Sequence, residues 1–351
     1  MDTPGSTPAA TTPPKAESVN RIGLTLDSYK GAESTLCAGC GHNSVTAQII
    51  RACFMAGVEP HKLVKLSGIG CSSRTPAFFV RSAHGFNSVH GRMPPLATGV
   101  AMANKHLQII GVSGDGDTAS IGMSHYIHTV RRNTDMVYLI ENNGVYSLTK
   151  GQLSATADVG SRLKNGQVND LPPIDCCGLA IELGCGFVAR SFSADAKQLY
   201  ALLMAALQHK GTAVLDVLSP CITFNNHDGS TKSYKCLKDK ETPLHELDVC
   251  EKSGVQAEAP SAGEIDLGNG YIVRFKKVGQ DYDPTDLKNA YLSIERARSE
   301  NLFLTGLLYR NPARQSFKEY CNTVDEPLAT LPLDRVRPSE ESFENMLASF
   351  A

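Results

Sequence analysis

The sequence predicts an α/β fold with a mostly parallel sheet covered by helices on both faces. Three short segments are almost continuously apolar: 107–112 (LQIIGV), 136–140 (MVYLI) and 213–218 (AVLDVL). Helix-like segments separate them, and strands that are buried on both faces have this continuous apolar character. The chain has 351 residues, of which 42% are apolar, so it can bury a large core.

The expected elements alternate along the chain. Residues 1–30, rich in Thr, Pro and Ala, are expected to form a disordered or extended leader. Apolar periodicity then predicts helices, the third with Thr118 as its N-cap, over 43–56, 95–106, 118–132 and 195–209. These helices and the three strands define a main domain over 31–224.

The alternation of strand-like and helix-like segments ends at about residue 224. Residues 225–262 are polar and are expected to be loop-like, 265–275 is expected to form a hairpin that turns at 268–270, and 287–298 an exposed helix. We therefore expect a C-terminal appendage over 225–351 that packs on the core or on a partner subunit.

Composition excludes several classes of protein. The formal net charge is -2, whereas nucleic-acid binders usually have a basic excess. The sequence has no apolar run of about 18 residues, so we expect no membrane span. The cysteine count is odd, at eleven, and the N-terminal residues do not resemble a signal peptide. We therefore expect a cytoplasmic protein whose clustered cysteines bind metal or take part in chemistry.

A glycine-rich turn follows the first apolar strand, in the segment 113–119 (SGDGDTA), and a helix is expected after it. Such a turn can hold a phosphate group, because glycines let the backbone approach and the helix N-terminus faces the anion. One interpretation is a nicotinamide cofactor site, because Gly114, Gly116 and Ala119 fit G-x-G-x-x-A and Glu141 stands where an acid would bind the ribose.

Asp115 favours a different ligand. Its carboxylate would lie beside the diphosphate, and the two anions would repel unless a divalent cation lay between them. Asn143 follows the next strand, and successive parallel strands end at the same edge of the sheet, so Asp115 and Asn143 can share one cation. An Asn-Gly pair alone is typical of a turn. Because Asp115 is expected at the same edge of the sheet as the Asn-Gly pair, we favour a metal–diphosphate site over a simple turn.

The cysteines indicate a second site. Cys37 and Cys40 form a C-x-x-C knuckle, which by itself fits zinc, an iron–sulfur cluster or a redox dithiol. Cys71 lies in a glycine-lined loop, and Cys221 follows the last apolar strand, at the sheet edge expected for Asp115. This placement favours electron transfer over a remote structural zinc. The remaining cysteines are expected to act as small buried apolar residues: Cys53, Cys176, Cys177, Cys185, Cys236, Cys250 and Cys321.

The motifs CAGCGH, GIGCS, HGR, GDGD, NNGVY and SPC occur in this order and together resemble the β subunits of 2-oxoacid:ferredoxin oxidoreductases, most closely those that use 2-oxoglutarate. The resemblance covers residues 30–235. It implies the thiamine-diphosphate-binding fold, Mg²⁺ held by Asp115, the Asn143 side chain and the Val145 carbonyl, and a [4Fe–4S] cluster on Cys37, Cys40, Cys71 and Cys221.

The resemblance and the chemistry of the side chains together predict further roles. Thiamine diphosphate is expected to contact Gly41, His42, Gly70, Cys71, Ser72, His90, Gly114, Asp115, Gly116, Asp117, Asn143, Val145 and Tyr146. His42 and Lys150 are the candidate catalytic residues. The substrate is expected to contact Arg74, Arg92, Leu148 and Lys150. Cationic groups suit a dicarboxylate such as 2-oxoglutarate better than pyruvate, and arginine binds carboxylates in a bidentate manner.

The implied activity is the coenzyme A-dependent oxidative decarboxylation of 2-oxoglutarate to succinyl-CoA and CO₂, with electrons passing through the cluster to ferredoxin. No candidate was found for the carboxylate that activates the aminopyrimidine ring. The resemblance places it on an α subunit, in an α2β2 heterotetramer, so the chain alone is expected to be inactive. The alternatives are a pyruvate or broad 2-oxoacid substrate, a nicotinamide-dependent dehydrogenase, and a non-catalytic zinc-binding module.

Overall fold

A computed structural model describes residues 18–163, 166–252, 263–277 and 282–350. Its centre is an eight-stranded sheet in the order β2-β1-β3-β4-β8-β7-β13-β9. The strands are β1 (Leu63–Ser67), β2 (His84–Asn87), β3 (Gln108–Gly114), β4 (Met136–Asn142), β7 (Phe187–Phe192), β8 (Thr212–Leu218), β9 (Glu241–Pro243) and β13 (Phe303–Arg310).

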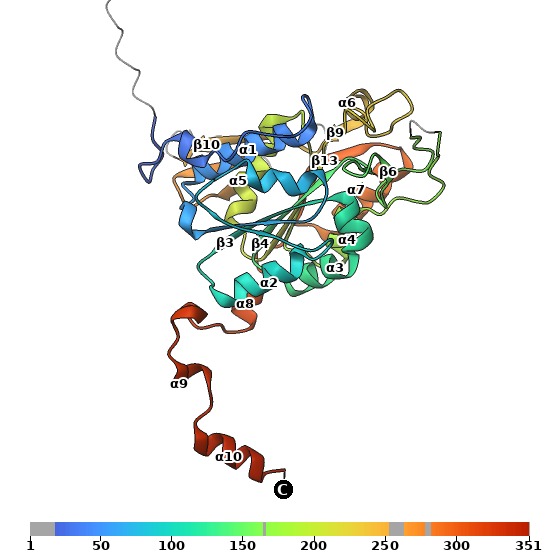
Figure 1. Cartoon of the computed structure of the whole chain (residues 1–351). Helices are drawn as coiled ribbons and strands as arrows, with labels where there is room; N and C mark the ends of the chain where they lie inside the picture. The colour runs from blue at the N-terminus through green and yellow to red at the C-terminus, as the bar shows by residue number, and fades with distance from the viewer. Residues whose placement is uncertain (1–17, 164–165, 253–262, 278–281, 351) are drawn as a thin grey trace, which may run out of the picture.

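The first six strands in this order are parallel to one another, and β13 then pairs antiparallel with β7. Helices cover both faces (Figure 1). One face packs against α1 (Gly41–Ala56) and α5 (Ala196–Gln208). The other packs against α2 (Met93–Ala103), α3 (Met123–Arg132), α4 (Cys176–Glu182) and α7 (Leu287–Ser299). The predicted α/β class with a mostly parallel sheet is confirmed.

The sequence of the central strands explains why both faces are covered. Every residue of β4 is buried, and its side chains alternate between the two cores. Val137 and Leu139 pack on the α1 and α5 side, whereas Tyr138 and Ile140 pack on the α2 and α3 side. A strand of this composition is stable only between two apolar layers.

Smaller elements complete the fold. A three-stranded sheet packs against α5 and consists of β10 (His245–Glu251), β12 (Tyr271–Lys277) and β11 (Glu264–Asp266). β5 (Val145–Tyr146) and β6 (Gln152–Leu153) form a small hairpin after β4. Short 3-10 helices are η1 (Leu26–Tyr29), η2 (Pro60–Lys62), η3 (Cys71–Ala77) and η6 (Leu328–Thr330), and α6 spans Tyr234–Lys240.

Most predicted elements are present with shifts of a few residues at their ends, including the hairpin at 268–270 and the helix α7. The helix expected over 118–132 is different. Residues Asp117–Ile121 form a π-helical turn, and α3 begins at Met123. The prediction of Thr118 as an N-cap was therefore wrong, because its hydroxyl donates to Ser113 Oγ at 2.9 Å.

The described part of the predicted leader is ordered. Tyr29 is fully buried, and its hydroxyl donates to the Val58 carbonyl at 2.8 Å. Asn20 donates to the Phe54 carbonyl at 2.9 Å, which joins this segment to α1. Residues 1–17 lie outside the described residues. The leader that was expected to end at residue 30 is thus part of the folded body from residue 18.

The C-terminal part is not a simple appendage. β13 lies inside the main sheet, and residues 225–252, expected to be loop-like, contain α6, β9 and β10. The remaining residues of the expected loop, 253–262, lie outside the described part. α7 was expected to be exposed, but Ala290, Ile294 and Ala297 are buried on one side of it.

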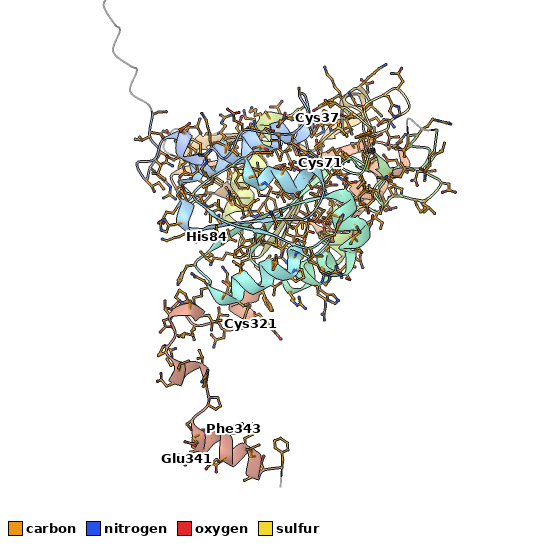
Figure 2. The ribbon with its side chains drawn as sticks, viewed as in Figure 1. Cys37, Cys71, His84, Cys321, Glu341 and Phe343 are labelled. Carbon is orange, nitrogen blue, oxygen red and sulfur yellow. The ribbon has the colours of Figure 1, made fainter. Side chains whose placement is uncertain are left out.

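α8 (Phe317–Tyr320) packs on the body, where the Phe317 amide donates to the Asn133 carbonyl at 2.9 Å. α9 (Leu333–Val336) and α10 (Glu340–Ala348) then extend away from the body (Figure 1). Phe343 and Glu341 of α10 lie far from Cys37 and Cys71 at the opposite side of the molecule (Figure 2). In the part of the chain that the structure describes, no helix is long and apolar enough to cross a bilayer.

Candidate functional site

Four loops at the carboxyl edge of the parallel sheet bring the predicted site residues together. Cys71 follows β1, Asp115 follows β3, Asn143 follows β4 and Cys221 follows β8. α1 begins at the same edge, because the amide of Gly41 donates to the Pro220 carbonyl at 3.4 Å. Ligand sites of open α/β sheets occur at this edge, in the crevice beyond the strand ends.

A cavity of about 120 Å³ lies among these loops. Most of the residues predicted to contact a diphosphate cofactor line it: His42, Gly70, Cys71, Ser72, His90, Gly114, Asp115, Gly116, Asp117, Asn143, Val145 and Tyr146. Leu148, predicted to contact the substrate, lines it as well. The cavity therefore joins the glycine-rich turn, the Asn-Gly loop and two of the cysteine segments in one site.

Asp115 joins the turn after β3 to the loop after β4. Its carboxylate accepts hydrogen bonds from the amides of Asn143 at 3.2 Å and Gly144 at 3.1 Å, and from the Thr156 hydroxyl at 2.7 Å. The Ser154 hydroxyl donates to it as well. Burial raises the pKa of Asp115, while these donors oppose that shift because they favour the charged form. The two oxygen-rich loops are thus held together without a metal.

Asp117 fixes the neighbouring His90-Gly91 turn. It accepts from the Gly91 amide at 2.7 Å and from the Ser113 hydroxyl at 2.6 Å, and it also contacts the His90 ring. Gly91 has φ 72°, and a Cβ there would lie 2.7 Å from the Gly122 backbone. Only glycine therefore suits this turn.

The floor of the cavity is formed by glycines in close contact with side chains. A Cβ at Gly116 would lie 2.4 Å from the Tyr146 ring, and a Cβ at Gly114 would lie 3.0 Å from Ser72 Oγ. The Ser72 hydroxyl is buried and has no hydrogen-bond partner among the described residues. A buried hydroxyl without a partner is costly, so this group is suited to a polar ligand.

His42 and Glu141 form a buried pair beneath the cavity. His42 Nδ1 lies 3.2 Å from Glu141 Oε2, in a geometry that is not a hydrogen bond. The Thr75 hydroxyl donates to both carboxylate oxygens, at 2.9 and 3.0 Å. Burial raises the pKa of Glu141 well above its usual range and lowers the pKa of His42 to about 4.

The four cysteines lie close enough to influence one another. Burial raises the pKa of Cys40 to about 12, and the nearby Glu141, Cys221 and Cys71 raise it further. Burial also raises the pKa of Cys71, as do Cys221 and Cys37. Cys37 is exposed, Cys71 is half-buried, and Cys40 and Cys221 are buried. The electrostatic effects of these cysteines on one another indicate that their segments lie near one another.

Gly41 makes this approach possible. A Cβ at Gly41 would lie 2.9 Å from the backbone of Ser219, so a larger residue would separate the knuckle from the loop that contains Cys221. The Thr223 hydroxyl, two residues after Cys221 in the same loop, donates to Cys37 Sγ at 3.6 Å.

The structure brings one group of possible metal ligands close together among the described residues. In the described residues, the group of possible ligands within 4.8 Å of one another is Asp175, Cys177 and Asp216, not the four cysteines. Arg190 already neutralises that group, at 2.5 Å from Asp175 and 3.2 Å from Asp216.

Several predicted residues lie outside the cavity lining: Gly41, Arg74, Arg92 and Lys150. Arg74 is exposed and donates to the Thr35 carbonyl at 3.1 Å. Lys150 is also exposed and has φ 78°, in the turn between β5 and β6. Each lies within three residues of a residue that lines the cavity.

The sequence analysis missed other cavity residues, which are Ile69, Glu141, Ser147 and Thr149. Glu141 was considered only as a ribose ligand. Its signal was present in the sequence, because it is a charged residue in a fully buried strand, and such a residue needs a partner.

Comparison with known proteins identifies the family. Residues 68–217 match the family described as thiamine pyrophosphate enzyme, C-terminal TPP binding domain. A 2-oxoglutarate synthase subunit KorB from Methanocaldococcus jannaschii is 34% identical over 273 residues, which are 75% of this chain and 94% of the relative. The chain belongs to the β subunits of 2-oxoacid:ferredoxin oxidoreductases. The fold and family implied by the motifs are therefore confirmed.

Two more comparisons describe the extent of the likeness. The β subunit of a Saccharolobus solfataricus 2-oxoacid:ferredoxin oxidoreductase is 42% identical over 202 residues, which are 56% of this β subunit and 65% of the relative. The chain thus spans less than two thirds of that relative. A solved 2-oxoglutarate:ferredoxin oxidoreductase from Magnetococcus marinus, with 2-oxoglutarate, coenzyme A and succinyl-CoA bound, matches 93% of this chain and 96% of its own, with a TM-score of 0.71 and 26% identity.

Proposed function

We propose that this β subunit forms the thiamine diphosphate and [4Fe–4S] part of a 2-oxoglutarate:ferredoxin oxidoreductase. The proposed reaction converts 2-oxoglutarate, coenzyme A and oxidised ferredoxin to succinyl-CoA, CO₂ and reduced ferredoxin. The main support is that His42 and Cys71, from the cysteine segments, line the same cavity as Asp115 and Asn143. Two sites that look separate in the sequence are adjacent in the fold.

The residues of the cavity fit a diphosphate cofactor with Mg²⁺. When bound, thiamine diphosphate supplies the electron sink that makes decarboxylation of a 2-oxoacid feasible. Asp115, the Asn143 side chain and the Val145 carbonyl would hold the cation, since Mg²⁺ prefers oxygen ligands. The Gly114 and Gly116 backbone would admit the phosphates, and the unpartnered Ser72 hydroxyl would bind a polar group.

The cavity size supports an assembly with an α subunit. Its volume is about 120 Å³, whereas pockets for cofactor-sized ligands are about 300–1,000 Å³. This chain would then supply one wall of the site, and the α subunit would supply the opposite wall and the carboxylate that activates the aminopyrimidine ring. An α2β2 heterotetramer would contain two such sites.

Cys37, Cys40, Cys71 and Cys221 fit a [4Fe–4S] cluster. Cys71 lines the cavity, so a cluster on the four cysteines would lie beside it. Cys40 is the N-cap of α1, whose positive end favours the negative charge of a thiolate-bound cluster. The chain would thus hold the electron acceptor next to the reacting cofactor.

The names of the relatives and of the solved neighbour support 2-oxoglutarate as the substrate. Leu148 lines the cavity and would contact the aliphatic part of the substrate. Arg74, Arg92 and Lys150 stand on segments that flank the lining, and they would bind the second carboxylate once the α subunit closes the site. Pyruvate, or a broad range of 2-oxoacids, is the alternative substrate.

The test is to co-express the chain with its α subunit and to purify the complex without oxygen. We expect about four irons and four sulfides per β subunit, bound thiamine diphosphate, and viologen reduction that needs 2-oxoglutarate and coenzyme A. The β subunit alone should be inactive. A complex that holds one zinc per chain, or that binds NAD without thiamine, would instead support the zinc module or the dehydrogenase.

A matched pair of variants tests the cluster ligands. Cys71→Ser should lose most of the iron, whereas Cys250→Ser, which changes another half-buried cysteine far along the sequence, should keep it. Equal iron contents in the two variants would contradict the proposed ligand set.

A further inference from the structure

We infer that α6 and the cysteine knuckle form the docking surface for an acidic ferredoxin-type electron carrier. This inference rests on the proposed function, because it needs a cluster on the four cysteines. The α6 surface is defined here by Cys37, Gly39, Lys235, Lys238 and Lys240. Cys37 is the exposed cysteine of the four, α6 lies beside the knuckle, and α6 carries a net positive charge.

Cys37 is the accessible edge of the proposed cluster. It is exposed, whereas Cys40 and Cys221 are buried, and Cys71 is half-buried and lines the cavity. In Figure 2, Cys37 lies at the outer margin of the body, further out than Cys71. Electron transfer between proteins becomes much slower as the separation grows, so a carrier should bind where the cluster is nearest the solvent. That place is the knuckle.

α6 lies directly beside this edge. The Tyr234 hydroxyl donates to the Gly39 carbonyl at 3.3 Å, and the Thr223 hydroxyl lies 3.6 Å from Cys37 Sγ. Ser233 is the N-cap of α6, and its side chain accepts from the Cys236 amide at 3.2 Å. In Figure 1, α6 lies on the side of the molecule on which Figure 2 shows Cys37. The helix and the knuckle thus form one continuous surface.

The net charge of α6 is positive, because the helix has three lysines and one carboxylate. Lys235 and Lys238 are exposed, Lys240 is half-buried, and Asp239 is the only acidic residue of the helix. Among the described residues, no carboxylate forms an ion pair with any of these three lysines. By contrast, many other lysines are paired with carboxylates, such as Lys62, Lys197, Lys232, Lys252 and Lys276.

A hollow beside α6 gives the surface a shape that can receive a partner. It has a volume of about 510 Å³, and Lys235 and Lys240 lie on it together with Asp228 and Asp239. Arg74, three residues after Cys71, is exposed as well. The lysines of α6 therefore place positive charge beside the knuckle, although the whole chain has a formal net charge of -2.

This arrangement fits a negatively charged protein that carries electrons. Complementary charges accelerate encounter and orient the partners, and their effect weakens as salt increases. Ferredoxin is the acceptor in the name of the family, and a strongly acidic ferredoxin would place its negative surface on the lysines while its own cluster approaches Cys37.

The experiment compares two charge-reversal variants in the co-purified αβ complex. The test variant is Lys235→Glu with Lys238→Glu. The matched control is Lys62→Glu with Lys210→Glu, two exposed lysines that precede β1 and β8 and so lie at the opposite edge of the sheet. Each variant changes the net charge by the same amount. The substrate is a purified two-cluster ferredoxin with a strongly negative net charge.

At about 20 mM salt we expect the test variant to lose roughly tenfold or more in kcat/KM for ferredoxin, and the control less than twofold. The difference should shrink at about 300 mM salt, where charges are screened within a few ångströms. The Kd of the isolated complex for ferredoxin, measured by calorimetry, should rise by a similar factor. Iron content and the rate with a small viologen dye should stay at the native level.

Two results would overturn the inference. Ferredoxin kinetics and affinity that change no more in the test variant than in the control would show that α6 is not the docking surface. Equal losses with ferredoxin and viologen would show that the lysines act on the site itself. If the native complex contains no iron and reduces no viologen, the proposed function fails first, and this inference fails with it.

Discussion

His42 Nδ1 and Glu141 Oε2 lie 3.2 Å apart where both side chains are almost wholly buried. Burial favours the neutral form of each group, so it raises the pKa of Glu141 and lowers the pKa of His42 to about 4. A buried pair of this kind titrates as a unit. We therefore expect one proton on the pair at neutral pH, held mainly by Glu141.

Glu141→Gln tests this protonation state. Because its pKa is raised in the folded state, native Glu141 binds more protons when folded than when unfolded, from its unfolded pKa of about 4.3 up to its folded pKa. The stability of the native protein should then fall with rising pH in that window. The glutamine variant has no such titrating group, so its stability relative to the native protein should rise with pH above the unfolded pKa of glutamate, by at most about 1.4 kcal/mol per pH unit.

The measurement is urea unfolding of both proteins at several pH values. Glu246→Gln, at an exposed position of β10, is the control and should show no such trend. If the stability difference between Glu141→Gln and the native protein were independent of pH, Glu141 would not be the protonated partner.

Gly41→Ala should damage the proposed cluster more than the fold. The added Cβ would lie 2.9 Å from the Ser219 backbone and would push the knuckle away from the loop that contains Cys221. Overpacking of this kind costs about 1–3 kcal/mol. We expect the iron content of the anaerobic αβ complex to fall severalfold. Gly99→Ala in α2, where a Cβ meets nothing within 4 Å, should keep its iron, and equal iron contents would argue against this role of Gly41.

Arg190→Met should be strongly destabilising. Burial alone would raise the pKa of Asp175, but the Arg190 guanidinium outweighs it and holds that pKa below its usual value. Without Arg190, Asp175 and Asp216 would be like charges without their cation, at a cost of about 3–5 kcal/mol. Thermal unfolding would measure this, with Arg296→Ala, which removes an exposed pair with Glu300, as a control that costs under about 1 kcal/mol. Similar losses in the two variants would contradict the importance of the buried network.

Removal of residues 327–351 should leave the stability of the body unchanged. No residue of α9 or α10 is buried, and Phe343, Met346, Leu347 and Phe350 of the last segment are 47–83% exposed. We expect the Tm of the truncated chain to lie within about 2 °C of the native value by calorimetry. The cut retains Asp325, whose ion pair with Lys105 joins this segment to the body. A larger decrease in Tm would show that the tail packs on the body in solution.

The sequence predicted the centre of the fold because the central strands are strongly patterned. Val137 to Ile140 are apolar on both faces, which identifies a buried parallel strand, and parallel strands place Asp115 and Asn143 at one edge. The C-x-x-C spacing in the sequence was sufficient to predict the Cys37–Cys40 knuckle. The direction of the strands placed Cys221 at the same edge as Asp115, and the grouping of all four cysteines followed from the family resemblance.

Other features depend on contacts between distant segments, which a single sequence does not reveal. Thr118 has the residue type of an N-cap, but its hydroxyl donates a hydrogen bond to Ser113 Oγ. A π-helical turn precedes α3, so the helix begins later in the sequence than predicted. The pairing of His42 with Glu141 joins the start of α1 to the end of β4. Arg74 was predicted from its place three residues after Cys71 and from the way arginine binds carboxylates, whereas in the fold it donates to Thr35, which lies 39 residues earlier.

The place of β13 in the sheet has a consequence for synthesis on the ribosome. Leu307 of β13 pairs with Ala189 of β7, so 118 residues of chain separate the two partners. At about 5–20 residues per second, the edge of β7 waits roughly 6–24 s for its neighbour to emerge. During this interval β7 is an open, apolar edge strand that can pair with another nascent chain. Overproduction of this protein should therefore be limited by this interval, and slower initiation of translation should increase the soluble yield.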